Sequence, residues 1–480
     1  MSAPVSLWWL RLDLRLANNP ALCAAIKAGG AVIPLFIWSP EEESPWSPGR
    51  ASNWWLHQSL AALDAQLRRA GSRLVFRRGP ALETLLALGQ ETGATAVFWN
   101  RRYEPALIAR DARIKDALRA AGWKAESCNA ALLHEPWTVQ NKSGRPFQVF
   151  TPFWKHCLTL EEPDEPRPAP ATLPAPEKWP QSIPLARLEL EPKINWAAGF
   201  RTQWTPGEAG AQDHLNKFLT AAWSGYSEQR NRPDLTGTSR LSPHLHFGEI
   251  SPRQIWHALQ RLAAKRRLPK SEWHGSQFLA ELGWREFAHH LLYHFPRTTD
   301  QPLRREFATF PWQENTTQLR AWQQGLTGYP IVDAGLRELW TTGWMHNRVR
   351  MIVASFLVKD LQQSWLAGAR WFWDTLVDAD LAQNSLGWQW TAGCGADAAP
   401  YFRVFNPTTQ GEKFDPNGDY VRRWCPELAR LPAAWIHQPP AAPAAILRAA
   451  NVALGKNYPA PIVDHAQARI TALAALKQIR

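Results

Sequence analysis

Three side chains with complementary chemistry stand on one face of a segment with helical spacing. Glu281, Trp284 and Arg285 occupy positions i, i+3 and i+4, so a helix presents a carboxylate, an indole and a guanidinium together. Such a face could stack on a base flipped out of a nucleic acid, hydrogen-bond its edge and hold a phosphate. An ion pair within the helix is the simpler alternative, and the spacing fits both.

A second segment is rich in hydroxyl groups. Tyr226 and Arg230 precede the run Thr238–Ser242, which stands just ahead of a helix expected at Pro243. Hydroxyl and backbone N–H groups beside an arginine, leading into a helix, form a cradle for phosphate. Taken alone, the run is explained at least as well by Ser242 acting as an ordinary N-cap.

Two more segments place charges among apolar residues. Asn347, Arg350 and Met351 repeat the i, i+3, i+4 spacing, and Asp378 and Asp380 are nearly adjacent acids in an apolar stretch. Acids in such surroundings need partners. We expect Arg350 to pair with Asp378 in a bidentate ion pair.

Several motifs point away from common enzyme classes. Residues 393–398 satisfy Gly-x-Gly-x-x-Ala but follow no strand, which predicts a loop, and neither a P-loop nor a Gly-x-Ser-x-Gly motif occurs. His289 and His290 lack the spacing of a zinc helix, and we expect no metal. The 5 cysteines form no Cys-x-x-Cys motif, which suits a reducing cytoplasm.

Short apolar runs alternate with amphipathic segments over the first 130 residues. This alternation predicts a Rossmann-like α/β domain with a parallel sheet covered on both faces. The expected strands are 5–10, 31–38, 73–76, 95–99 and 123–128. Helices are expected between them, each followed by a glycine that suits a left-handed cap, namely Gly29, Gly71, Gly93 and Gly122.

A proline-rich stretch separates this pattern from a long helical part. From residue 209 onward the apolar residues recur at helical spacing, and no strand-like alternation of comparable length follows. We therefore expect an α/β domain over residues 1–132, an interdomain linker over 133–208 and a large all-α domain over 209–480.

The overall composition indicates which classes of binding partner the protein could have. A net charge of +12 favours a polyanion, with nucleic acid first, although solubility alone would also explain it. No apolar run is long enough to suggest a membrane span. The 28 tryptophans are a large excess for a chain of this size. They indicate either that indoles take part in stacking or electron transfer, or that the core is rich in aromatic residues.

Together these segments resemble the photolyase and cryptochrome family. The resemblance runs from residues 9–16 to residues 458–463 and is most specific at 328–334, 344–348 and 397–410. It implies an α/β antenna-binding domain and an all-helical domain that binds DNA and a bent FAD. The residues expected to bind FAD are Tyr226, Thr238, Ser239, Arg240, Leu241, Ser242, Asn347, Arg350, Asp378, Ala379, Asp380 and Asn384.

Asn384 would face the flavin N5, according to this resemblance. An amide can accept a hydrogen bond from a protonated N5 but cannot take up the proton. Members that signal in plants carry an acid here, so Asn384 favours repair. The implied reaction is light-driven electron transfer from reduced FAD to a cyclobutane pyrimidine dimer in DNA, with return of the electron.

The resemblance also implies how the lesion is held. Trp284 would stack on the flipped dimer, Glu281 would hydrogen-bond a pyrimidine carbonyl, and Asn347 and Met351 would complete the pocket. Further DNA contacts are expected from Arg230, Arg285, Arg348, Trp390 and Gln410. A chain of indoles relaying electrons to oxidised FAD would be formed by Trp312, Trp365 and Trp388, each of which could also be ordinary core.

The subgroup is indicated by residues 38–43, 48–52 and 54–57, which look most like class III dimer photolyases. Ala106 and Leu107 stand where folate-binding class I enzymes have Asn and Glu, so a methenyltetrahydrofolate antenna would use other contacts. A blue-light signalling cryptochrome is the chief rival, and a photolyase for (6-4) photoproducts ranks third. We expect a cytoplasmic monomer.

Overall fold

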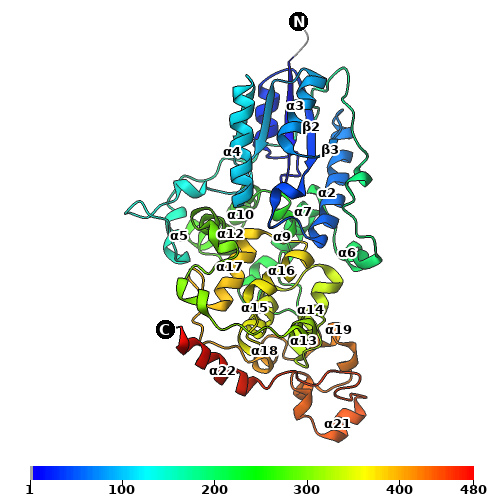
Figure 1. Ribbon diagram of the computed structural model, residues 1–480, viewed down its shortest axis with the longest axis vertical. Coiled ribbons are helices and arrows are strands. Elements are labelled where there is room, and N and C mark those ends of the chain that lie inside the picture. Colours follow the sequence, from blue (N-terminus) through cyan, green and yellow to red (C-terminus); the bar gives the residue numbers. More distant parts are fainter. Residues whose placement is uncertain (1–3, 480) are drawn as a thin grey trace. The chain divides into compact units, whose positions relative to one another are not determined.

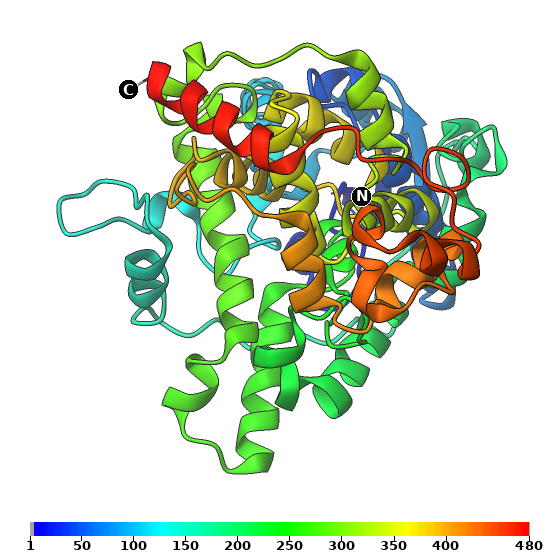
Figure 2. The same cartoon turned by 90° about the horizontal axis from the view of Figure 1, so that it is seen from below.

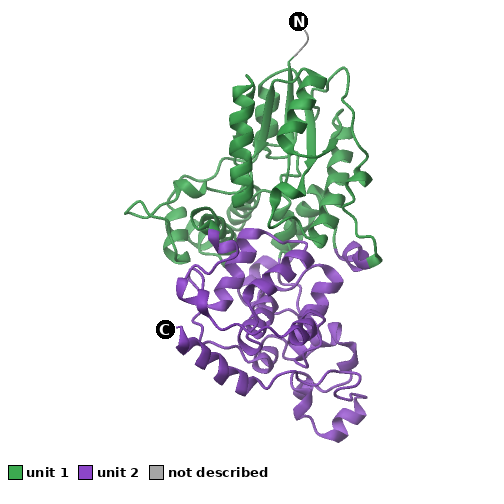
Figure 3. Cartoon of the chain, in the orientation of Figure 1, with its two compact units in different colours: residues 1–195, 204–220, 239–296 green, residues 196–203, 221–238, 297–480 purple. Residues whose placement is uncertain are grey.

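The computed structural model describes residues 4–479, which form two compact units (Figure 3). The first contains the chain up to Asn195 with Trp204–Thr220 and Ser239–Pro296, and the second contains Trp196–Gln203, Ala221–Thr238 and the chain from Arg297 onward. These limits differ from the predicted ones, since residues 239–296 belong to the unit that holds the sheet. The predicted domain limits stay a prediction.

The first unit is built on a parallel sheet of five strands in the order β3-β2-β1-β4-β5 (Figure 1). The strands are β1 (Val5–Leu10), β2 (Ala31–Trp38), β3 (Val75–Arg78), β4 (Ala96–Asn100) and β5 (Lys124–Cys128). The helices between them are α1 (Pro20–Lys27), α2 (Arg50–Arg69), α3 (Ala81–Thr92) and α4 (Pro105–Ala120). All five predicted strands are present, and only the third shifts noticeably, from 73–76 to Val75–Arg78.

The core of this unit explains why the three inner strands β1, β2 and β4 are nearly continuous apolar runs. Leu7 of β1 pairs with Ile33 of β2 and with Val97 of β4, and none of the three is exposed. A parallel sheet is covered on both faces, so successive residues are buried whichever way they point. Gly93 ends α3 with a φ of 73°, which confirms the predicted left-handed cap.

Six further helices belong to the first unit. They are α5 (Phe150–Cys157), α7 (Glu208–Lys217), α9 (Ser242–His246), α10 (Pro252–Arg266), α11 (Lys270–His274) and α12 (Gln277–His294). Helix α5 lies inside the segment predicted as a linker, where its single apolar face of Phe153, Trp154 and Cys157 was too short to register as helical spacing. It packs beside α12 (Figure 1 and Figure 2).

The second unit is helical. Its helices are α6 (Ala198–Gln203), α8 (Tyr226–Gln229), α13 (Thr316–Gln323), α14 (Pro330–Thr342), α15 (Asn347–Ser355), α16 (Trp365–Thr375), α17 (Leu381–Ala392), α18 (Pro407–Phe414), α19 (Asp419–Trp424), α20 (Ala433–Ile436), α21 (Ala444–Ala449) and α22 (His465–Gln478). Helix α22, red in Figure 2, packs against the π-helical turn Phe356–Asp360.

The predicted fold class, a parallel α/β domain followed by a helical one, is confirmed. Within residues 4–479, no helix is both long and apolar enough to cross a membrane. Residues 393–398 form a loop after α17, as predicted. Asp380 caps α17 by accepting a hydrogen bond from the Gln383 N–H at 2.9 Å.

Candidate active site

The predicted ion pair lies in the second unit, between α15 and the start of α17. Arg350 donates from Nη2 to both carboxylate oxygens of Asp378, at 3.1 and 2.8 Å, while its Nε donates to the Met345 carbonyl at 2.7 Å. The pairing is confirmed, but one nitrogen serves both oxygens because Nε is already engaged. Asp378 is only 2% exposed, so this guanidinium offsets the cost of burying its charge.

Asn384 is oriented by its own helix pair. Its Nδ2 donates to the Ala369 carbonyl of α16 at 2.9 Å. With the amide nitrogen bound there, the side-chain oxygen points away from that carbonyl and can act only as an acceptor. Asp380 lies one turn earlier on the same helix, after the buried Ala379. The predicted flavin-edge residues therefore follow one another on α15 and α17.

The predicted phosphate segment is divided between the units. Tyr226 and Thr238 belong to the second unit and residues 239–242 to the first. Arg240 adopts a left-handed φ of 52°, with its guanidinium 4.3 Å from the centre of the Trp204 ring. Leu241 is the N-cap of α9, so the alternative of Ser242 as an ordinary N-cap is wrong. Helix α9 is only five residues long, which leaves hydroxyl, backbone and arginine groups as the phosphate-binding candidates.

A buried polar cluster that the sequence did not reveal stands next to this segment in the first unit. Glu249 accepts a hydrogen bond from Trp55 Nε1 at 2.9 Å and is hydrogen-bonded to His244 Nδ1. His244 and Glu249 are fully buried. His214 packs against His244, and burial lowers the pKa of His214 to about 4. The sequence signal for this cluster was Glu249 itself, because an acid among apolar residues needs a buried partner.

Helix α12 carries the predicted lesion-binding face in the first unit. Gln277 Nε2 donates to Glu281 Oε1 at 2.7 Å, and the Trp284 ring stacks on Phe150 of α5. Arg285 is buried and donates to the Ala131 carbonyl at 2.6 Å. This hydrogen bond anchors the side chain through Nη1, and the predicted contact between Arg285 and DNA stays a prediction.

Two arginines of the second unit lie close together. The Arg348 guanidinium donates to Asn231 Oδ1 at 2.6 Å and lies 4.5 Å from the Phe414 ring of α18, the helix that also carries Gln410. Burial and then the nearby Arg230 lower the pKa of Arg348. Like charges gathered beside a neutral partner favour the binding of an anion. Met351, Asn347 and Trp390 are at least partly accessible in the same unit.

The three predicted relay tryptophans also belong to the second unit. Trp388 is 2% exposed and contacts Phe372 and Trp322, with ring centres 5.0 and 6.2 Å apart. Trp365 begins α16 and is buried, and Trp312 packs on Phe310 at 4.3 Å. Helices α16 and α17 are in contact. The relay role stays a prediction.

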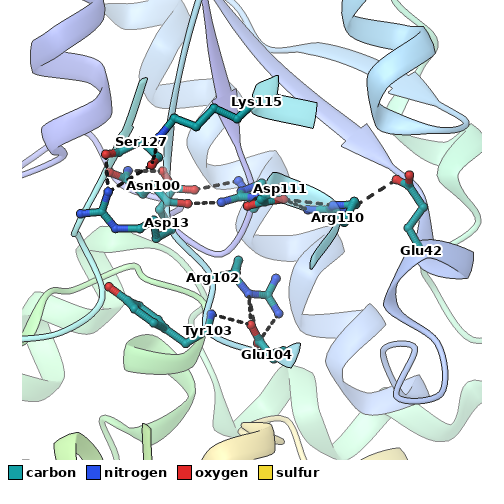
Figure 4. Close-up of polar contacts among 12 residues, drawn as sticks. Asp13, Glu42, Asn100, Arg102, Tyr103, Glu104, Arg110, Asp111, Lys115 and Ser127 are labelled. Atoms are coloured by element: carbon teal, nitrogen blue, oxygen red, sulfur yellow. Dashed lines mark hydrogen bonds and ion pairs between the residues drawn. The ribbon is translucent and has the colours of Figure 1, made fainter. Parts of the chain in front are cut away.

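The sheet of the first unit ends in a dense group of charged and polar side chains, which we call the sheet-edge cluster. Figure 4 labels six of its members, Asp13, Asn100, Arg102, Glu104, Arg110 and Asp111, and the seventh is Arg11, which is bound to Asp111. Asp111 lies 2.6 Å from Arg11 and 2.9 Å from Arg110, and Glu104 lies 2.5 Å from Arg102. Asn100 donates to Asp13 at 2.6 Å. Leu107 on α4 is buried and offers no polar group.

Two segments of the chain match models of one family. Residues 6–175 match the family model "DNA photolyase", and residues 278–478 match "FAD binding domain of DNA photolyase". The deoxyribodipyrimidine photo-lyase of Agrobacterium fabrum is 50% identical over 100% of this chain and 98% of its own. Cryptochrome-1 of Arabidopsis thaliana is 43% identical over 98% of this chain and 70% of its own.

A solved structure supports the same family assignment. The crystal structure of a bacterial class III photolyase from Agrobacterium tumefaciens has a TM-score of 0.95 and 50% identity, covering 100% of this chain and 98% of that one. A parallel α/β unit joined to a helical unit of this type defines a two-part flavoprotein. The chain belongs to the photolyase and cryptochrome family.

Proposed function

We propose that this protein is a deoxyribodipyrimidine photo-lyase, which uses FAD and blue light to restore cyclobutane pyrimidine dimers in DNA. The observation that carries the proposal is the orientation of Asn384, whose nitrogen is held by the Ala369 carbonyl so that its oxygen is an acceptor. This amide would accept a hydrogen bond from a protonated flavin N5 and could not take up the proton. The photo-lyase from Agrobacterium fabrum, 50% identical, supports the same reading.

The donor set of the chain fits FAD. Arg350 is a cation fixed by Asp378, as the electron-rich edge of a reduced flavin requires, and Asp380 and Asn384 supply further polar atoms on α17. Tyr226, Thr238 and residues 239–242 would hold the phosphates. Bound FAD supplies the electron that opens the cyclobutane ring and receives it back.

The lesion and its strand need different groups. Trp284 offers an indole for stacking and Glu281 a carboxyl for a pyrimidine edge, with Asn347 and Met351 completing the pocket. The DNA strand would be contacted by Arg230, Arg285, Arg348, Trp390 and Gln410. Extruding the dimer costs a few kcal/mol, least for a badly stacked pair. No proton is transferred, so no acid–base pair is required.

A signalling cryptochrome is the second candidate, because Cryptochrome-1 of Arabidopsis thaliana is 43% identical over nearly the whole chain. A receptor would need no productive lesion pocket. We propose further that the protein acts as a cytoplasmic monomer, and that an antenna such as methenyltetrahydrofolate binds the first unit through contacts other than residues 106 and 107.

One experiment tests the repair proposal. Purified protein with FAD bound and reduced is mixed with an oligonucleotide that contains one thymine dimer, and half of the sample is kept dark while the rest is illuminated with blue light. We expect intact thymines to return only in the light. Absence of repair, with FAD shown to be bound by absorbance, would refute the proposal and leave the receptor as the better candidate.

A further inference from the structure

The ring of Trp284 does not stand alone on α12. Its centre lies 3.9 Å from the centre of the Phe150 ring, and the two planes differ by only 9°. The edge of Phe287, one turn further along α12, faces the same indole at 5.8 Å and 74°. A parallel contact this close fixes the plane of the indole as well as its position.

Phe150 belongs to a continuous apolar interface between α5 and α12. Phe150, Phe153 and Trp154 stand at i, i+3 and i+4 on α5, and Phe153 packs against Phe287 at 5.2 Å. The backbone of Gly283 approaches Trp154 so closely that an added Cβ would lie 2.5 Å from the indole. This tight contact fixes α5 against α12 at the turn that carries Trp284.

The solvent exposure of Phe150 differs from that of its neighbours in the chain. Val149, directly before it, is 47% exposed, whereas Phe153 and Trp154 are buried. Phe150 lies between these extremes and is partly exposed, as is Trp284. The stacked pair is therefore the outermost layer of the interface, and Phe150 covers the side of the indole that faces α5.

We propose that Phe150 is a positioning residue for lesion recognition, which holds the indole of Trp284 in the plane that a flipped pyrimidine dimer meets. The proposal rests on the proposed repair function. A side chain locked by packing gives up little freedom when the lesion stacks on it, whereas a loose indole must be ordered at that moment. Phe150 would act through Trp284 and need not touch DNA.

The test compares affinities in the dark, where no dimer is consumed. Dissociation constants are measured for one oligonucleotide with and without a single thymine dimer, using the wild type, Phe150→Leu, Phe150→Tyr, Trp284→Ala and the double variant Phe150→Leu/Trp284→Ala. Val149→Ala is the matched control on the adjacent exposed residue. FAD content and thermal midpoint are recorded for each protein, because a purely structural role would change those first.

We expect Phe150→Leu to lower the ratio of damaged to undamaged affinity about tenfold, the size of a coupling between contacting side chains. The FAD content of Phe150→Leu should stay at the wild-type value. Phe150→Tyr, which keeps an aromatic ring, should keep the wild-type affinity ratio, and Val149→Ala should leave the ratio unchanged. In the Trp284→Ala background, Phe150→Leu has no further effect. If Phe150→Leu does not fold, Phe150→Met replaces it with a flexible side chain.

Two results would overturn the inference. A wild-type ratio in Phe150→Leu, with Trp284→Ala defective, would show that the indole needs no support. A higher affinity for the dimer in Phe150→Leu would show that Phe150 occupies the place of the lesion. Failure of the proposed function gives a different result, since the wild type itself would then not distinguish the damaged oligonucleotide.

Discussion

Two groups of arginines in this chain differ in what surrounds them. In the sheet-edge cluster of the first unit, each of Arg11, Arg102 and Arg110 lies within 3 Å of a carboxylate. Burial works to lower the pKa of Arg102, but Glu104 and Glu43 outweigh it, and the pKa is raised. In the second unit, Arg348 binds the neutral Asn231, and burial and then Arg230 lower its pKa.

The difference separates arginines bound to carboxylates within the chain from Arg348, which is bound to a neutral amide. An arginine matched by a carboxylate inside the chain has little left to offer a phosphate. An arginine beside another arginine is stabilised when an anion arrives. We therefore infer that Arg348, held by the neutral Asn231, is better suited to bind a DNA phosphate than the arginines of the sheet-edge cluster.

The largest expected effect comes from breaking a matched pair inside the second unit. Arg350→Leu leaves the buried Asp378 carboxylate without its guanidinium, which costs about 3–5 kcal/mol. We expect the free energy of unfolding in urea to fall by this amount and FAD to be lost on purification. Combining it with Asp378→Asn removes the orphaned charge and should restore much of the stability. A single variant as stable as the wild type would contradict the role given to this pair.

Glu286 provides a pH-dependent case in the first unit. It accepts hydrogen bonds from the Leu133 and His134 backbones, and burial raises its pKa from 4.5 to about 7. The folded state therefore holds the proton more tightly than the unfolded chain. This contribution is complete below about pH 4.5 and is lost as the pH rises through 7, by up to about 3 kcal/mol.

Urea unfolding of the wild type and Glu286→Gln across this range tests it. The stability of the wild type relative to Glu286→Gln should fall between pH 5 and pH 8, because glutamine does not titrate. A difference that does not change with pH would show that Glu286 remains ionised, and that the hydrogen bonds from the backbone suffice to hold a buried charge.

The sequence predicted those parts of the site in which a residue's own surroundings reveal what it needs. It did not predict contacts between segments that only folding brings together. The strands followed from apolar runs, and the Arg350–Asp378 pair from the need of a buried acid for a cation. The stacking of Phe150 on Trp284 joins residues far apart in the chain, and no local spacing encodes it. The same holds for Trp55 and Glu249, since only the folded chain brings the indole N–H to the acid.

Arg285 shows a contact that spacing does not reveal. Helical spacing places it on the face of Glu281 and Trp284, and a guanidinium there suggests a phosphate, which stays a prediction. The structure adds a hydrogen bond from its Nη1 to the Ala131 carbonyl, which a distant segment supplies. Periodicity gives the direction of a side chain but not the backbone group that it meets.

Removing the indole of Trp284 should have an effect of intermediate size on the preference for damaged DNA. Trp284→Ala is expected to lower the preference for dimer-containing DNA by about 1–3 kcal/mol, the usual worth of a stacked base. FAD content, measured by absorbance, should not change, because the role proposed for this indole is in binding the lesion and not in holding FAD. Unaltered preference for damaged DNA would remove Trp284 from the proposed pocket.

The smallest effect bears most directly on the two groups of arginines. Arg348→Gln should weaken binding to damaged and undamaged DNA alike, and should reduce the slope of log affinity against log salt by about 1, because one phosphate contact is lost. Arg102→Gln removes the same charge from the sheet-edge cluster. It should leave the salt slope unchanged and lower the thermal midpoint, since Glu104 loses the guanidinium that is bound to it. Equal salt slopes for the two variants would mean that a cation's internal partners do not decide whether it binds DNA.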